Sequence, residues 1–160
     1  MAQEIERKYL LKSDSWRELV TRSVPITQGY FPSSGVTVRA RIAGDEGFLT
    51  IKGKCSDNLV RSEFEYRVPV EDVRSMLEEF CGTRVVEKIR HYVPAENGLV
   101  WEIDEYLGLN KGLFTAEIEL PYPDMQYTVP DWTGEDVSMV PRYSNGALSK
   151  HPYSLWENEI

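Results

Sequence analysis

Charged and apolar side chains alternate along much of the chain with a period of two residues, which is the period of a β-strand. Near the start of the chain, Glu4, Glu6 and Lys8 alternate with Ile5 and Tyr9. Six further segments repeat the alternation, at residues 38–42, 49–54, 63–68, 88–93, 101–104 and 116–120, and an eighth strand is expected at residues 26–31. The pattern predicts a mainly β protein, α+β in class, in which one face of each strand is polar.

Turn and helix signals divide these strands. The segments at residues 32–35, 44–47 and 96–98 are rich in turn residues, and Asn97-Gly98 accepts the positive φ of a tight hairpin. Residues 15–18 match a capping box that opens a short helix, and residues 70–80 place apolar side chains at helical spacing. From Pro121 onward we expect mostly irregular chain, with a short helical turn near residues 134–138.

The charged residues have one sign within most strands. The acidic doublets are Glu63 with Glu65, Glu102 with Asp104, and Glu117 with Glu119, and the basic ones are Arg39 with Arg41, Lys52 with Lys54, and Lys88 with Arg90. An ordinary solvent-facing sheet, which is the simplest interpretation of any single strand, mixes neutral polar residues with charges of both signs. Doublets on seven strands indicate instead that the polar face lines an enclosed space. An eight-stranded antiparallel barrel has such an interior, wide enough for a small ligand.

Charges inside a barrel need compensation, because removing an unpaired ion from water costs several kcal/mol. Carboxylates obtain it by holding hard divalent cations such as Mg²⁺, which binds carboxylates and phosphate oxygens together. Arginine and lysine obtain it by holding a multiply charged anion, such as a chain of phosphates. The two kinds of doublet therefore point to a metal and a phosphate ligand in the same space.

These residues match a known family. The segment Glu4-Ile5-Glu6-Arg7-Lys8 carries the E-x-E-x-K signature of the CYTH superfamily, also called the triphosphate tunnel metalloenzymes. The other matches follow in the family's order: Gln28-Gly29-Tyr30, Arg39 with Arg41, Thr50 to Lys52, Glu63 with Glu65, Glu87 to Arg90, Glu102 with Asp104, and Glu117 with Glu119. The chain resembles the short bacterial-type inorganic tripolyphosphatases of this family over nearly its full length.

The resemblance implies one tunnel domain over residues 1–160 that uses Mg²⁺ or Mn²⁺ as cofactor. By this resemblance the metal ligands are Glu4, Glu6, Glu63, Glu65, Glu102, Asp104, Glu117 and Glu119, the substrate-binding residues are Arg39, Arg41, Lys52, Lys54 and Arg90, and the catalytic residues are Lys8, Tyr30 and Lys88. Lys8 and Tyr30 are expected to face each other, and Tyr30 has the alternative role of only shaping the tunnel.

The C-terminal segment departs from the family pattern. Arg142-Tyr143-Ser144-Asn145 keeps a basic residue followed by Tyr-x-Asn, but Ser144 and Gly146 stand where related chains carry lysines. A positively charged plug at the tunnel end is therefore in doubt, and contributions from Arg142 or Lys150 stay open. For Trp156 we consider a lid or a dimer contact.

The resemblance favours hydrolysis of inorganic tripolyphosphate to pyrophosphate and phosphate. Alternatives that keep the tunnel are a nucleoside or thiamine triphosphatase and an adenylyl cyclase. A module that binds polyphosphate or a nucleotide without catalysis belongs to another class, as does a plain barrel with a charged exterior. Intact Lys8 and Tyr30, together with both acidic doublets at the chain ends, argue against the non-catalytic module.

The net charge of −8, from 26 acidic and 18 basic residues, argues against nucleic acid as a partner and at first against any polyanion. The inward set, however, has a net charge of only −1. It comprises acidic residues 4, 6, 63, 65, 102, 104, 117 and 119, and basic residues 8, 39, 41, 52, 54, 88 and 90. Two Mg²⁺ ions would make that interior positive, so the acidic total describes the outside of the protein.

The rest of the sequence predicts a cytoplasmic protein that has a small triphosphate substrate and does not associate with membranes. The start of the chain lacks the pattern of a signal peptide, and no run approaches ~18 apolar residues. Cys55 and Cys81 match no metal or redox spacing and are expected to be reduced thiols. His91 and His151 are interpreted as structural or surface residues. A homodimer is considered as well.

Overall fold

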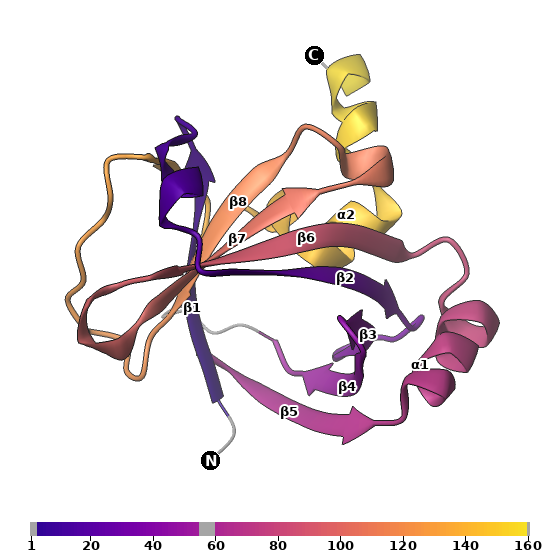
Figure 1. Cartoon of the computed structure of the whole chain (residues 1–160). Coiled ribbons are helices and arrows are strands. Elements are labelled where there is room, and N and C mark those ends of the chain that lie inside the picture. Colours follow the sequence, from indigo (N-terminus) through magenta and orange to yellow (C-terminus); the bar gives the residue numbers. More distant parts are fainter. Residues whose placement is uncertain (1–2, 55–59, 160) are drawn as a thin grey trace.

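Antiparallel strands form most of the computed structural model, which describes residues 3–54 and 60–159 (Figure 1). In chain order the strands are β1 (Gln3–Leu11), β2 (Arg22–Tyr30), β3 (Thr37–Ala43), β4 (Glu46–Lys52), β5 (Val60–Val68), β6 (Val85–Pro94), β7 (Val100–Tyr106), β8 (Phe114–Glu119) and β9 (Thr133–Asp136). Across the sheet they follow the order β5-β4-β3-β2-β6-β7-β8-β1-β9. Most neighbours in the sheet are therefore also neighbours in the chain, as hairpins require.

Pairing between β1 and β5 closes the sheet into a barrel. Residues 3–5 of β1 pair with residues 60–62 of β5, while residues 6–10 of β1 pair with β8. The eight-stranded antiparallel barrel expected from the charge pattern is thereby confirmed. The ninth strand, β9, pairs with the far end of β1 at Tyr9 and Leu11. The helical turn expected near residues 134–138 is wrong, because residues 133–136 pair with β1 as a strand instead.

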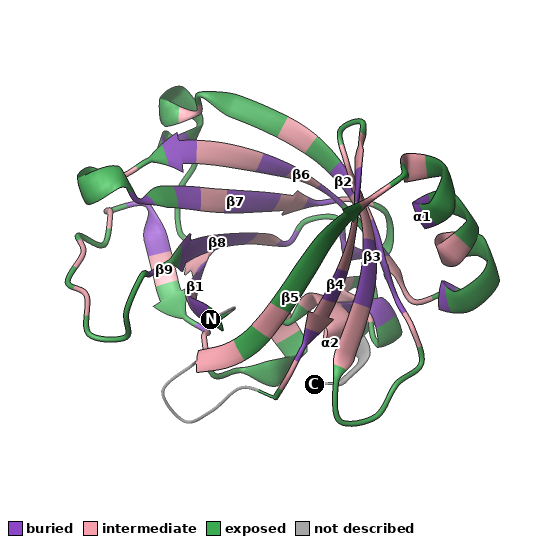
Figure 2. Cartoon of the chain, turned by 90° about the horizontal axis from the view of Figure 1, so that it is seen from below, coloured by how far each residue is buried: buried purple, intermediate pink, exposed green. Residues whose placement is uncertain are grey.

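The apolar core lies on the outside of the barrel wall. Ile5, Tyr9, Trp101, Ile103 and Ile118 are buried there, and they alternate along their strands with the charged residues of the interior. Trp132 covers this face from the segment that follows β8, with its ring centroid 5.4 Å from that of Trp101. Figure 2 shows the resulting alternation of buried and less buried positions along β6 and β7, whereas β5 is largely exposed. No helix of the described residues is both long and apolar enough to span a bilayer.

The first two helical segments lie where the sequence predicts them, with one difference. The helix expected at residues 70–80 is confirmed as α1 (Val70–Met76), which continues as the π-helix η2 (Leu77–Cys81). It packs outside the barrel on β2, β3 and β4. The capping box at residues 15–18 is wrong, because Ser15 is already the first residue of the 3₁₀ segment η1 (Ser15–Leu19). The Ser15 hydroxyl is paired with that of Ser13 at 3.0 Å and caps no backbone amide.

Gly29 explains how η2 approaches β2 so closely. A Cβ atom on Gly29 would lie 2.6 Å from Leu77 Cδ2 and 2.8 Å from Cys81 Sγ, which is closer than van der Waals contact allows. Any larger residue would push η2 away from the strand. The glycine of the Gln28-Gly29-Tyr30 match is therefore required by packing.

The C-terminal segment is more regular than expected. It forms η5 (Pro141–Tyr143), α2 (Asn145–Lys150) and η6 (Tyr153–Glu159). The Ser144 hydroxyl accepts a hydrogen bond of 3.1 Å from the Ala147 amide and so caps α2. Leu148 and Trp156 are buried in an apolar cluster with Val86 of β6. Trp156 does not line the cavity, and its ring belongs to the packing that fixes α2 to the barrel, so a lid or dimer contact at this residue stays a prediction.

Candidate active site

The barrel encloses a cavity of about 270 Å³ whose walls are almost entirely polar. Its lining consists of Glu4, Glu6, Lys8, Gln28, Tyr30, Thr37, Arg39, Arg41, Lys52, Arg61, Glu63, Glu65, Lys88, Arg90, Glu102, Glu117, Glu119, Ser144, Asn145 and Gly146. All but two of the site residues expected from the sequence are in this set. The period-two alternation places them there, because every second residue of each strand faces the interior.

Lys54 and Asp104 are the two exceptions. Lys54 is exposed and lies beyond the end of β4 at Lys52, so the alternation no longer directs its side chain inward. Asp104 is completely buried behind the lining, where it accepts hydrogen bonds from Lys88 and Arg90. Arg61 of β5 lines the cavity in place of Lys54. The interior, with Asp104 included, therefore keeps the expected net charge of −1.

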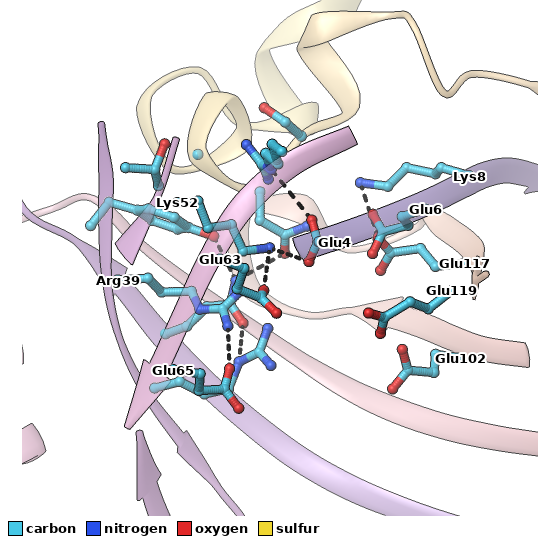
Figure 3. Close-up of a pocket in the computed structure, with 18 of the residues that line it drawn as sticks. Glu4, Glu6, Lys8, Arg39, Lys52, Glu63, Glu65, Glu102, Glu117 and Glu119 are labelled. Atoms are coloured by element: carbon cyan, nitrogen blue, oxygen red, sulfur yellow. Dashed lines mark hydrogen bonds and ion pairs between the residues drawn. The ribbon is translucent and has the colours of Figure 1, made fainter. Parts of the chain in front are cut away.

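Four carboxylates gather on one side of the cavity: Glu6, Glu102, Glu117 and Glu119 (Figure 3). The strand register places Glu6 opposite Glu119 and Glu102 opposite Glu117. Burial and the neighbouring Glu117 raise the pKa of Glu6 well above its usual value. Partial burial and repulsion from Glu4, Glu63 and Glu102 raise the pKa of Glu119 to about 7. These carboxylates therefore repel one another and favour a bound proton or cation.

Lys8 balances part of this acidic group. Its ammonium lies 3.7 Å from Glu117 Oε2 and donates a hydrogen bond of 3.1 Å to the backbone carbonyl of Tyr143. Although burial opposes ionisation of Glu117, Lys8 and Arg90 hold the pKa of this carboxyl well below its usual value. Glu117 is therefore ionised, whereas the raised pKa of Glu6 favours its protonated form.

The other acidic residues of the lining are held by cations of β3, β4 and β5. Lys52 Nζ lies 2.8 Å from Glu4 Oε2 and 3.3 Å from Glu63 Oε2, so one ammonium bridges two carboxylates. Arg61 Nε lies 3.3 Å from Glu4 Oε1. Glu65 accepts hydrogen bonds from Arg39 and from the Thr50 hydroxyl. Lys52 is thus engaged with acids rather than free for an anion.

The cationic side of the cavity is less well compensated. Arg41 forms no ion pair with any carboxylate of residues 3–54 and 60–159, and its Nε donates to Gln28 at 2.9 Å. Burial, together with repulsion from Arg39 and Arg90, lowers the pKa of Arg41 to about 10. Arg39 Nε is buried without a hydrogen-bond partner in the described part of the protein. Arginines in this state form a site for an anion with several oxygens.

Lys88 is the most enclosed cation of the lining. Its ammonium donates 2.7 Å to Asp104 Oδ2 and 2.9 Å to Asn145 Oδ1. Burial, aided by repulsion from Arg90 and Arg41 and opposed by Asp104, lowers the pKa of Lys88 to about 7. An amine with this pKa can exchange a proton near neutral pH.

Tyr30 lines the cavity, as expected, but its hydroxyl accepts a hydrogen bond of 2.7 Å from Gln28. Between the described atoms of Lys8 and Tyr30 there is no hydrogen bond. Lys8 is hydrogen-bonded to the Tyr143 carbonyl and Tyr30 to Gln28. That Lys8 and Tyr30 face each other therefore stays a prediction.

Arg61 and Asn145 are cavity residues that the sequence analysis did not select. Arg61 precedes the doublet Glu63 and Glu65 by two residues, so the alternation itself could have identified it. Asn145 lies in the Tyr-x-Asn match, but its position in the cavity depends on how α2 folds back. Arg142 stacks on Trp156, with its guanidinium carbon 4.1 Å from a ring centroid, and Lys150 is exposed, so neither lines the cavity.

Neither histidine, nor Cys81, belongs to the lining of the cavity. His91 bridges Ser23 and Glu105 on the outside of the barrel, at 2.7 and 2.9 Å, and His151 is exposed. Cys81 is buried as a free thiol against Gly29, and Cys55 lies outside the described residues.

The carboxylates fit a divalent metal by their chemistry. No three Asp, Glu, His or Cys side chains in the described ranges are already arranged around one metal position. The donors are nevertheless all carboxylates, which hard divalent cations prefer. The raised pKa values of Glu6 and Glu119 reflect crowded negative charge, which a cation would relieve.

The family model of the CYTH domain matches residues 2–150 of the chain. The protein belongs to the CYTH family. Its sequence is 42% identical, over 96% of this chain and 97% of the relative, to an inorganic triphosphatase of Acetivibrio thermocellus. It is 33% identical to an inorganic triphosphatase of Nitrosomonas europaea, over 91% of this chain and 96% of that relative. A solved structure of an inorganic triphosphatase superposes with a TM-score of 0.63 at 30% identity, covering 93% of this chain and 95% of that one.

Proposed function

We propose that this CYTH protein is a divalent-metal-dependent triphosphatase that hydrolyses inorganic tripolyphosphate to pyrophosphate and phosphate inside the barrel. The observation that carries the proposal is the division of one cavity inside the barrel into two charged sides. Arg39 and Arg41 present incompletely compensated positive charge to a cavity whose opposite side holds mutually repelling carboxylates. Relatives of nearly the same length, named inorganic triphosphatases, support the same activity.

The size and lining of the cavity favour an inorganic substrate over a nucleotide or thiamine triphosphate. Its volume of about 270 Å³ lies below the roughly 300–1,000 Å³ typical of pockets for drug-sized organic ligands. Tyr30 is the single aromatic residue in the lining of the described protein, and its hydroxyl is hydrogen-bonded to Gln28. A base or a thiazolium ring would have little apolar surface to stack on.

Each side of the cavity would have its own part in the reaction. Glu6, Glu102, Glu117 and Glu119 would hold a divalent cation, either Mg²⁺ or Mn²⁺. A bound cation neutralises phosphate charge and makes a water molecule more nucleophilic. Arg39, Arg41 and Arg90 would bind the phosphate oxygens and fix the chain of the substrate. Lys88, protonated at Nζ when a polyanion is bound, would donate a proton or a hydrogen bond to the departing phosphate oxygen.

A phosphate-release assay tests this function. Tripolyphosphate, ATP and thiamine triphosphate are each incubated with the full chain in Mg²⁺, in Mn²⁺ and in a chelator. We expect turnover of tripolyphosphate in either metal, much slower turnover of the two organic substrates, and none with the chelator. Faster hydrolysis of ATP or thiamine triphosphate would reverse the order of substrates. Binding of tripolyphosphate without any turnover would mean a binding module rather than an enzyme.

We also propose that the protein is a cytoplasmic homodimer. The outer face of β5 leaves Phe64 and Tyr66 about half exposed, and a second copy could cover them. Light scattering of the purified protein measures the mass directly, and a mass of one chain would exclude the dimer.

A further inference from the structure

Asn145 lies at the meeting point of the tail and the barrel interior. It is the first residue of α2, directly after the capping residue Ser144, and it lines the cavity together with Ser144 and Gly146. Its Oδ1 accepts hydrogen bonds from Lys88 Nζ at 2.9 Å and from Gln28 Nε2 at 3.3 Å. Its Nδ2 donates one of 3.0 Å to the hydroxyl of Tyr106. The amide oxygen of Asn145 thus binds two residues of the cavity lining, and its NH₂ group binds Tyr106 of β7.

The contact with Lys88 differs in kind from the other contact of that ammonium. Asp104 compensates the charge of Lys88, but the same carboxylate also receives Arg90 through both of its oxygens. Asn145 is neutral, so it fixes the direction of an N–H bond without cancelling charge. Lys88 is 1% exposed, and Asp104 and Asn145 accept the hydrogen bonds that its ammonium donates. The amide oxygen and the carboxylate together therefore fix where the ammonium points.

Gln28 extends the same arrangement to a second cation. This residue is completely buried, and its Oε1 accepts from Arg41 Nε at 2.9 Å while its Nε2 faces Asn145 Oδ1. A pair of neutral amides thus connects Arg41 of β3 with Lys88 of β6. The two amides fix the positions of both cations without adding negative charge beside them.

We propose that Asn145 is a positioning residue, which α2 brings into the barrel to aim the Lys88 ammonium at the substrate. The inference rests on the proposed triphosphatase activity. The competing explanation is that Asn145 only anchors α2 through Tyr106. In the first explanation turnover depends on the hydrogen bond from Lys88 to Asn145 Oδ1, and in the second on the bond from Asn145 Nδ2 to Tyr106.

Asn145→Ala removes both the acceptor of Lys88 and the donor to Tyr106. Tyr106→Phe removes only the hydroxyl that anchors Asn145 and leaves the acceptor of Lys88 in place. We expect Asn145→Ala to lower kcat for tripolyphosphate by about 10- to 100-fold, the usual effect of losing a group that orients a reacting one, with a smaller change in KM. Tyr106→Phe should keep kcat within about threefold, although its melting temperature falls. Equal losses of kcat in the two variants would overturn the inference in favour of anchoring.

A double-mutant cycle with Lys88→Met adds a test that a merely structural role would not pass. If Asn145 acts through Lys88, Asn145→Ala should cost less than about twofold in kcat once Lys88 is absent, where the rest of the site supplies residual turnover. The same 10- to 100-fold loss in both backgrounds would refute the positioning role. Asn145→Ser replaces these variants if Lys88→Met turns over too slowly to measure or if Asn145→Ala does not fold. A larger loss of kcat in Asn145→Ser than in Tyr106→Phe would support the positioning role, and equal losses would favour anchoring. A wild-type protein that fails to hydrolyse tripolyphosphate would instead remove the proposed function itself.

Discussion

Lys88 Nζ lies 2.7 Å from Asp104 Oδ2, and both side chains are almost completely removed from water. A pair of this kind usually favours the charged lysine. Here burial outweighs that attraction, and Arg90 and Arg41 add repulsion, so the pKa of Lys88 falls to about 7. Lys88 therefore carries a charge that is conditional on what else occupies the cavity. A triphosphate, with its several negative charges, would stabilise the protonated form.

The pH dependence of turnover should report this conditional charge. As the pH rises through about 7, the free protein loses the positive charge of Lys88. Because kcat/KM reflects groups of the free enzyme, it should fall above about pH 7. The bound substrate raises the pKa of Lys88, so kcat should begin to fall only at higher pH. Initial rates of phosphate release between pH 5.5 and 9, at several concentrations of tripolyphosphate, measure both profiles.

Lys88→Arg is the control for that assignment. A guanidinium stays protonated over this whole range, so the descending limb of kcat/KM should disappear or move to much higher pH, even if the rate is low. An unchanged limb would mean that another group titrates.

Metal affinity should rise with pH, whereas kcat/KM is expected to fall above about pH 7. The pKa of Glu119 is raised to about 7, so this carboxyl is increasingly protonated below that pH, and a proton competes with the metal. Each pH unit below about 7 should therefore weaken binding of Mn²⁺ by up to about tenfold. Calorimetric titration without substrate measures this. Glu119→Gln should bind Mn²⁺ more weakly and with less dependence on pH.

Glu105→Gln provides a matched control for Glu119→Gln. Glu105 lies on β7 but faces outward, where it is paired with His91. The same change from carboxylate to amide at this position should leave metal binding as it is in the wild type. Equal losses of affinity in the two variants would exclude a specific role for Glu119.

Much of the barrel and its lining could be predicted because a strand places every second residue on the same face. The doublet Glu117 and Glu119 illustrates this, since spacing alone decides that both side chains face inward. The same rule fails where a strand ends. Lys54 continues the alternation in the sequence, but β4 stops at Lys52, and no side-chain period marks that end.

The parts that were missed depend on long-range contacts. The segment Thr133–Asp136 has no apolar alternation, and it becomes a strand only because the outer edge of β1 is available for pairing. Helix α2 is six residues long and contains Gly146, so its own propensity is weak. Its stability comes from the burial of Leu148 and Trp156 against the barrel. The place of Asn145 in the cavity follows from this packing and from no local signal.

Removing the charge of Arg41 should mainly weaken substrate binding, whereas removing the charge of Arg90 should mainly lower the stability of the protein. Arg41 has no carboxylate partner in the described protein, and crowding with Arg39 and Arg90 disfavours its ionised form. We expect Arg41→Met to raise KM for tripolyphosphate by about 10- to 100-fold, the loss of a charge-assisted contact. Its melting temperature should fall less than that of Arg90→Met, because the only bond lost among the described residues is the one to Gln28. Arg90 is bound to Asp104, Glu102 and Glu117, so Arg90→Met should cost about 3–5 kcal/mol of unfolding free energy. Thermal melts and steady-state kinetics of both variants separate the two effects. A large loss of stability in Arg41→Met would contradict the view that this residue is reserved for the anion.

Trp156 and Trp132 are both buried, but only Trp156 should affect turnover as well as stability. Trp156 packs edge-on against Tyr143 and Tyr153, with ring centroids 5.1 Å apart in both contacts, and so holds α2 against the barrel. Trp132 is buried to a similar degree, but it packs on Trp101 in the other apolar cluster. Replacement of either by Ala should cost about 3–5 kcal/mol of unfolding free energy, measured by urea denaturation. At a temperature where both variants are folded, Trp156→Ala should also lose kcat, because α2 carries Asn145 into the cavity, whereas Trp132→Ala should keep it. If both variants kept full kcat, the position of α2 would not matter for turnover, and if both lost it equally, the loss would reflect the barrel as a whole.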